Sequence, residues 1–341
     1  MNLPHARRAR LLARAHLHAA AFFLVAPALA FTPPAPAAQE TAAAPQRRTL
    51  HVTVMDKQGR FAGGLEREAF TVYDRGKPRP VVSLEAPDAP VSIGIVIDSS
   101  ASMKSRLKRK DSQGLSRLGK AVAAFLEKGR AENEYFVIGF NQSPQLILDR
   151  TRDRAAVLGA LDALTSDTAQ GRTALYDSCV LALDKVSYGA HARRAVLLIS
   201  DGVDTASRYT FADLRRRLME QDVTLYAIGV TEGPYDLSML DVVGRAILEE
   251  LAGVSGGRVA VPEDDKQLVF AAENLSVELR WQYALGVEFA PSTKKDGWHE
   301  VEVKVASQPD RVKKKSVKLY ARTRRGFYDS PRGVKTEARP E

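Results

Sequence analysis

The chain has 341 residues, of which 45% are apolar and 27% are charged, a composition typical of a soluble globular protein with one large domain or two ordinary ones. Its net charge of +9 falls to +5 when the four arginines of residues 1–30 are left out. This excess is only weak evidence for a nucleic-acid partner, and we predict none. Cys179 is the only cysteine, which excludes an internal disulfide.

Residues 1–30 have the order of an export signal. Arginines without any acidic residue are followed by the apolar run 19–25 and then by Ala28-Leu29-Ala30, an A-x-A cleavage pattern. The run is much shorter than the roughly 20 residues that a membrane span needs. We therefore predict an exported protein, periplasmic or secreted to the cell envelope, whose mature chain begins near Phe31 and has no transmembrane segment.

The next segments lack helical periodicity. Residues 31–47 are rich in proline and alanine and predict a flexible linker. Residues 48–88 predict a β segment, in which a strand is followed by two more on either side of an Arg75-Gly76 turn. Such a segment has too few strands to form a stable sandwich alone.

Residues 89–281 alternate between buried strands and amphipathic helices, which predicts a doubly wound, mostly parallel sheet covered on both faces. The predicted strands are 91–98, 135–140, 145–149, 194–200, 223–230 and 257–262. The predicted helices are 115–129, 154–164, 173–186, 211–221, 236–256 and 265–281.

Strands return after this α/β domain. Residues 282–326 alternate with the two-residue period of half-buried strands, and residues 327–341 predict a flexible tail. We expect the 282–326 segment to pair with the 48–88 segment in one β-sandwich. The fold class is therefore an α/β domain inserted between two β segments.

Three loops of the predicted α/β domain carry side chains with oxygen atoms. Asp98, Ser100 and Ser102 follow directly from the first strand, Thr173 lies just before a helix, and Asp201 lies just after another buried strand. Alone, each is more typical of a helix cap or a turn. Together at one sheet edge they form an all-oxygen set, which selects a hard cation such as Mg²⁺ or Mn²⁺ rather than zinc or copper.

This pattern of Asp98-x-Ser100-x-Ser102, then Thr173, then Asp201-Gly202 resembles the metal-ion-dependent adhesion site of von Willebrand factor type A domains. The resemblance implies bound Mg²⁺ (or Mn²⁺ or Ca²⁺), an open coordination position, and a protein partner that fills it with a Glu or Asp carboxylate. It also implies a binding or adhesion module rather than an enzyme. The basic loop 104–113 is longer than in many members of the family.

Two other functions fit the sequence less well. A metal-dependent hydrolase or phosphatase could use the same carboxylates, but an aspartyl phosphatase would typically have a second aspartate where Ser100 stands. A serine hydrolase would need a base, and no histidine accompanies these serines in the sequence. A subunit of a nucleotide-driven machine would fit some type A domains, but the chain has no P-loop and begins with an export signal.

Overall fold

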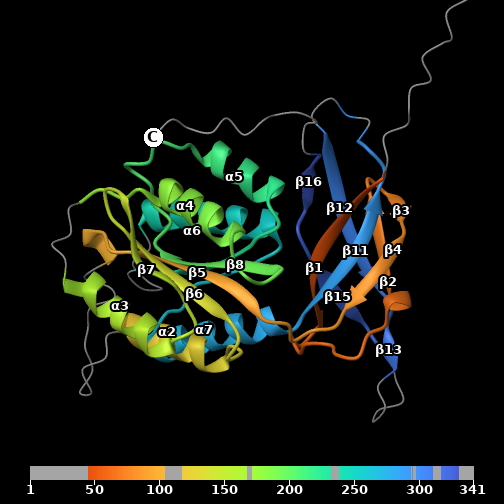
Figure 1. Cartoon of the computed structure of the whole chain (residues 1–341), viewed down its shortest axis with the longest axis horizontal. Helices are drawn as coiled ribbons and strands as arrows, with labels where there is room; N and C mark the ends of the chain where they lie inside the picture. The colour runs from red at the N-terminus through yellow and green to blue at the C-terminus, as the bar shows by residue number, and fades with distance from the viewer. Residues whose placement is uncertain are drawn as a thin grey trace, which may run out of the picture. The chain divides into compact units, whose positions relative to one another are not determined.

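The computed structural model describes residues 45–103, 117–166, 171–231, 238–292, 294, 297–309 and 316–329 (Figure 1). The predicted signal peptide, nearly all of the predicted linker, the basic loop 104–113 and the tail from residue 330 lie outside the described residues. No helix in the described ranges is both long and apolar enough to cross a membrane.

A six-stranded sheet forms the centre of the α/β region, with the order β10-β9-β8-β5-β6-β7. Every neighbouring pair runs parallel except β6 and β7. The strands are β5 (Val91–Asp98), β6 (Glu134–Phe140), β7 (Pro144–Thr151), β8 (Arg193–Ser200), β9 (Thr224–Gly229) and β10 (Val259–Ala260). All eight residues of β5 are buried, because helices cover both faces of the sheet.

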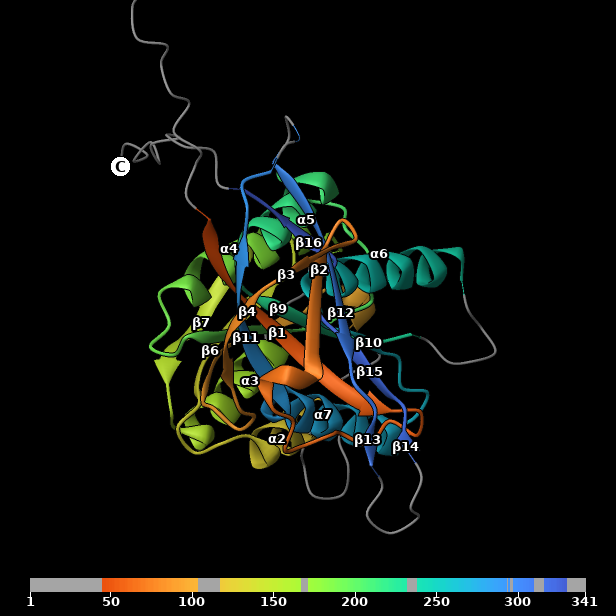
Figure 2. The same cartoon turned by 90° about the vertical axis from the view of Figure 1, so that its right-hand side faces the viewer.

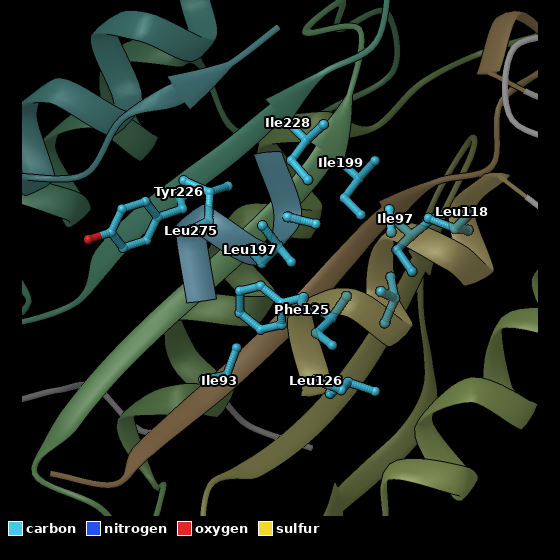
Figure 3. Close-up of a cluster of buried hydrophobic side chains, with 14 of the residues drawn as sticks. Ile93, Ile97, Leu118, Phe125, Leu126, Leu197, Ile199, Tyr226, Ile228 and Leu275 are labelled. Carbon is cyan, nitrogen blue, oxygen red and sulfur yellow. The ribbon is translucent and has the colours of Figure 1, made fainter. Parts of the chain in front are cut away.

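Two sets of helices cover the two faces, as Figure 1 shows. On one face lie α2 (Arg117–Lys128), α3 (Arg154–Ser166) and α7 (Asp265–Arg280). On the other lie α4 (Leu175–Ser187), α5 (Phe211–Glu220) and α6 (Met239–Ser255). Figure 3 shows the first of these cores, in which Ile93 and Ile97 of β5 meet Phe125 of α2 and Leu275 of α7.

Two antiparallel sheets, with the orders β15-β1-β11-β4 and β16-β12-β2-β3, make up the sandwich region (Figure 2). The strands are β1 (Gln46–Asp56), β2 (Phe70–Asp74), β3 (Lys77–Arg79), β4 (Val81–Glu85), β11 (Gln282–Phe289), β12 (Trp298–Val305), β15 (Leu319–Arg322) and β16 (Gly326–Tyr328). A further hairpin joins β13 (Gln308–Pro309) to β14 (Ser316–Val317).

The two ends of the described chain pair with each other in this sandwich region. Strand β1 pairs with β11 and β15, and β2 pairs with β12. One hydrophobic core is shared between the two sheets, with Leu50 and Val52 from β1 packed among residues of β2, β11 and β12. The predicted fold class, a doubly wound α/β unit between β segments that join each other, is confirmed. The exact domain boundaries stay a prediction.

The structure differs from three local predictions in and around the first β segment. The strand expected after the Arg75-Gly76 turn is split into β3 and β4, which belong to different sheets, because Pro80 has no N–H to continue a ladder. Residues 67–69 form a short 3₁₀ helix where no helix was expected. Strand β1 begins at Gln46, inside the predicted linker.

The predicted tail also begins too early. Phe327 lies in β16, which pairs with β12, and its ring is buried between Phe289 and His299. A strand of three residues is too short to give a periodic signal, so the sequence pattern did not indicate it.

Buried polar contacts join the sandwich region to the α/β region. Glu278 of α7 is almost fully buried and pairs with Arg258 of the α/β region and with Arg322 of β15. Arg324 is also buried and donates to the carbonyl oxygens of Leu218 and Met219 at the end of α5. These donors satisfy carbonyl groups that the last turn of a helix leaves without a partner.

Candidate metal centre

The candidate site lies where β5 and β8 end. These strands are parallel neighbours, with Ile97 opposite Ile199, so Asp98 at the end of β5 and Asp201 just after β8 reach the same edge. Strand β6 lies on one side of β5, whereas β8, β9 and β10 extend on the other. The strand order therefore reverses at this edge, which is the usual ligand-binding position in open α/β sheets.

Four of the five predicted residues form a continuous hydrogen-bonded cluster. Asp98 Oδ1 accepts from the Ser100 N–H at 2.9 Å, and Ser100 Oγ lies 3.2 Å from Ser102 Oγ. Ser102 Oγ in turn donates to Asp201 Oδ2 at 2.9 Å. Asp98 and Ser100 are buried whereas Ser102 is exposed. One end of the cluster is therefore shielded from solvent, and the other end is accessible to it.

The fifth residue, Thr173, is placed through its backbone. Its N–H donates to Thr205 Oγ1 at 2.9 Å, and its carbonyl oxygen accepts from the N–H groups of Thr205 and Ala206 at 2.8 and 3.0 Å. These bonds tie the loop before α4 to the loop that carries Asp201. Among the described residues, no hydrogen bond joins the Thr173 hydroxyl to the other four side chains.

Ser200 is a member of the site that the sequence analysis missed. Its Oγ donates to Asp98 Oδ2 at 2.8 Å and accepts from the Gly202 N–H at 3.0 Å, and the side chain is fully buried. It thus orients the Asp98 carboxylate and the turn after β8 at the same time. The only sequence signal is a hydroxyl that follows the apolar run 195–199 and directly precedes Asp201.

Two glycines fix the loop of Asp201 against helix α6. Gly202 has a φ of +84°, which disfavours any other residue. A Cβ atom on Gly202 would lie 2.3 Å from the Gly244 carbonyl oxygen, and one on Gly244 would lie 2.1 Å from the Asp201 carbonyl oxygen. The backbone of α6 therefore packs directly on the loop that carries a candidate ligand.

The electrostatics of the cluster favour a cation. Burial raises the pKa of Asp98 to about 6, and the negative charge of Asp201 adds to the rise, while hydrogen bonds from Ser100 and Ser200 reduce it. In the described part of the chain, every hydrogen-bond donor to Asp98 is a neutral group. A buried carboxylate of this kind is costly to ionise, and an added positive charge would remove that cost.

The donor set fits a hard divalent cation. It consists of carboxylate and hydroxyl oxygens from Asp98, Ser100, Ser102 and Asp201, with Thr173 on the adjoining loop. Within the described ranges, no three His, Cys, Asp or Glu residues gather as zinc or copper sites require. Oxygen ligands are those that Mg²⁺, Mn²⁺ and Ca²⁺ prefer.

The open, mostly parallel sheet with helices on both faces defines the class of the fold, a doubly wound α/β domain. Residues 93–203 match the family model of the von Willebrand factor type A domain, a segment that includes all five predicted site residues. This match confirms, for residues 93–203, the resemblance that the motif indicated. No curated protein matches the sequence.

Solved structures with a similar chain trace come from several sources. An aerotolerance-related membrane protein from Bacteroides fragilis is 20% identical, and the match covers 55% of this chain and 98% of that one, with a TM-score of 0.42. A von Willebrand factor type A protein from Catenulispora acidiphila is 15% identical, with coverages of 85% and 75% and a TM-score of 0.44. Proximal thread matrix protein 1 from the mussel byssus, with a zinc-occupied MIDAS motif, is 18% identical, with coverages of 60% and 50% and a TM-score of 0.47.

Proposed function

We propose that this protein is an exported, non-enzymatic binding module that holds a divalent cation and uses it to bind a carboxylate of a partner protein. Asp98, Ser100, Ser102, Thr173 and Asp201 would hold the cation, with Mg²⁺ the first candidate and Mn²⁺ or Ca²⁺ the others. The observation that carries the proposal is the hydrogen-bonded oxygen cluster at the switch point, built around a buried aspartate with neutral donors among the described residues.

The chemistry of the ligand set supports a carboxylate as the partner group. Two carboxylates and several neutral hydroxyls leave a bound divalent ion electrophilic, and the exposed side of the cluster at Ser102 would let an external anion approach it. A Glu or Asp side chain of another protein supplies that anion.

The hydrolase alternative has less support. The histidines that the structure describes lie away from the cluster. His299 bonds to Asp74 in the sandwich region, His191 bonds to the Glu132 carbonyl oxygen ahead of β8, and His51 faces Asp222. Ser100 and Ser102 thus have no described histidine that could act as their base.

Calorimetric titration of the mature chain with Mg²⁺ tests the metal site. Wild type should take up about one ion, and Asp98→Ala should weaken uptake at least about 100-fold, since even loss of a residue that only supports a ligand costs 10- to 100-fold. Asp149→Ala, an exposed carboxylate on the edge strand β7, is the matched control and should bind like wild type. Equal uptake by Asp98→Ala and wild type would refute the proposal.

Export is tested separately by N-terminal sequencing of protein recovered outside the cytoplasm. Cleavage after Ala28-Leu29-Ala30 should leave Phe31 as the first residue. A folded, soluble product that keeps Met1 would contradict export while leaving the metal site untouched.

A further inference from the structure

Helix α6 carries an exposed apolar surface on its first two turns. Met239, Leu240, Val242 and Val243 are 78%, 62%, 53% and 49% exposed, respectively, and we call these four residues the α6 patch. The other large exposed apolar side chains in the described part of the chain are scattered singly over several elements. Single exposed apolar residues are normal, but a contiguous group indicates an interaction site.

The patch belongs to a well-formed helix end. Ser238 Oγ accepts from the Asp241 N–H at 3.1 Å, and Asp241 Oδ2 accepts from the Ser238 N–H at 2.9 Å, a complete capping box. Asp241 is buried, so the acidic residue of the first turn is part of the cap and not of the exposed surface. The exposure of the patch is thus built into an ordered, capped helix.

The patch continues the edge that carries the candidate metal site. Gly244 packs on the Asp201-Gly202 backbone so closely that neither glycine has room for a Cβ atom. Leu240 precedes Gly244 by four residues and shares its helix face. The exposed apolar turns of α6 therefore stand directly beside the loop of a candidate metal ligand.

We propose that the α6 patch is the second half of the docking surface, and that the partner presents a Glu or Asp flanked within a few residues by apolar side chains. This inference rests on the proposed function. The metal would bind the partner's carboxylate, which any exposed Glu or Asp could supply. The α6 patch would add selectivity, because only a Glu or Asp with apolar neighbours would also bury apolar surface against it.

A displayed library of nine-residue peptides, with Glu fixed at the centre and all other positions random, tests this selection. Peptides captured by the mature chain in Mg²⁺ and released by EDTA should be enriched in apolar residues near the Glu. The double variant Leu240→Ser with Val243→Ser should bind a selected peptide at least about tenfold more weakly, with unchanged Mg²⁺ affinity. Phe270→Ser, at a 65% exposed position on α7, should bind like wild type.

The outcomes separate this inference from the proposed function. EDTA-released peptides without apolar neighbours, or equal peptide binding by the double variant, would overturn the role of the patch and leave the metal-dependent module standing. If wild type dimerises without Mg²⁺ and the double variant does not, the α6 patch binds a second copy of the chain. This result would also overturn the proposed role of the patch. Absence of Mg²⁺ uptake and of EDTA-released peptides in wild type would remove both proposals.

Discussion

Two aspartates, one in each region of the molecule, are equally buried and yet have opposite electrostatics. Asp74 of the sandwich region accepts from His299 Nδ1 at 3.0 Å and from Arg79 at 2.9 Å, with Arg75 beside it. Burial by itself would raise the pKa of Asp74, but the hydrogen bonds from His299 and Arg79 outweigh burial and hold this pKa below its usual range.

Asp98 of the α/β region accepts only from neutral groups of the described residues, and its pKa is raised to about 6. The difference supports a structural role for Asp74 and is consistent with the metal-binding role proposed for Asp98. The chain supplies cationic partners to Asp74, so its charge stabilises the sandwich. Around Asp98 the described residues supply hydroxyls and a second carboxylate, an arrangement in which a nearby cation would stabilise the ionised carboxylate.

The largest expected effect is on the sandwich. Asp74→Asn removes the charge that His299 and Arg79 share, and loss of one member of a buried pair costs about 3–5 kcal/mol of unfolding free energy. Because the pKa of Asp74 is lowered, its stabilising contribution is present at neutral pH and is lost as the pH falls below about 4. Chemical denaturation of both proteins at pH 7 measures the difference, and a loss below about 1 kcal/mol would contradict the assigned role.

The same Asp→Asn substitution at Asp98, in the candidate metal site, should raise the stability of the metal-free protein. In EDTA at pH 7, Asp98→Asn should be more stable than wild type by about 1–3 kcal/mol, because it removes a buried carboxylate whose pKa burial raises to about 6. Wild type without metal should lose stability between about pH 4 and pH 6, since its folded state holds the Asp98 proton more tightly than the unfolded state. Asp98→Asn should lack this part of the pH dependence.

Denaturation in EDTA across this pH range checks both statements, and calorimetry should show that Asp98→Asn no longer binds Mg²⁺. A metal-free Asp98→Asn protein that is less stable than wild type would mean that Asp98 is a structural residue like Asp74, and the contrast between the two regions would disappear.

Ser200 gives a smaller and more specific test. Ser200→Ala removes the donor that orients Asp98, so the Mg²⁺ affinity should fall about tenfold, within the range for residues that support a ligand. Ser178→Ala is a matched control, because Ser178 is equally buried and donates to the Ala174 carbonyl oxygen within helix α4. Calorimetry that shows the same loss for both variants would point to a general packing effect.

The smallest effect is expected at Thr173. Its hydroxyl makes no hydrogen bond to the described cluster, so Thr173→Ala should change the Mg²⁺ affinity of the resting protein by less than about threefold, a free-energy change below about 0.7 kcal/mol. Binding of a carboxylate peptide should weaken more, if the hydroxyl joins the site when a partner is bound. A large loss of resting Mg²⁺ affinity would place Thr173 among the permanent ligands.

The sequence by itself determined the layered α/β region, because buried strands and amphipathic helices have distinct periods that survive without a structure. It also indicated Asp98, Ser100, Ser102, Thr173 and Asp201, since parallel strands bring their carboxyl ends to one edge and the residue types agree with one motif. The assignment of these five residues to a metal remains a prediction that the experiments above test.

Only the tertiary structure decided the rest, because it depends on contacts between residues far apart in the chain. The strand register alone places Ser200 against Asp98, 102 positions away. Likewise, the close packing of Gly202 on Gly244 puts the apolar turns of α6 beside the candidate site. The hydrogen-bond partners of a buried polar residue, which no local pattern reports, also distinguish the two aspartates. Among the described residues, Asp74 packs against arginines and Asp98 against hydroxyls, and this difference in surroundings lowers the pKa of one side chain and raises the pKa of the other.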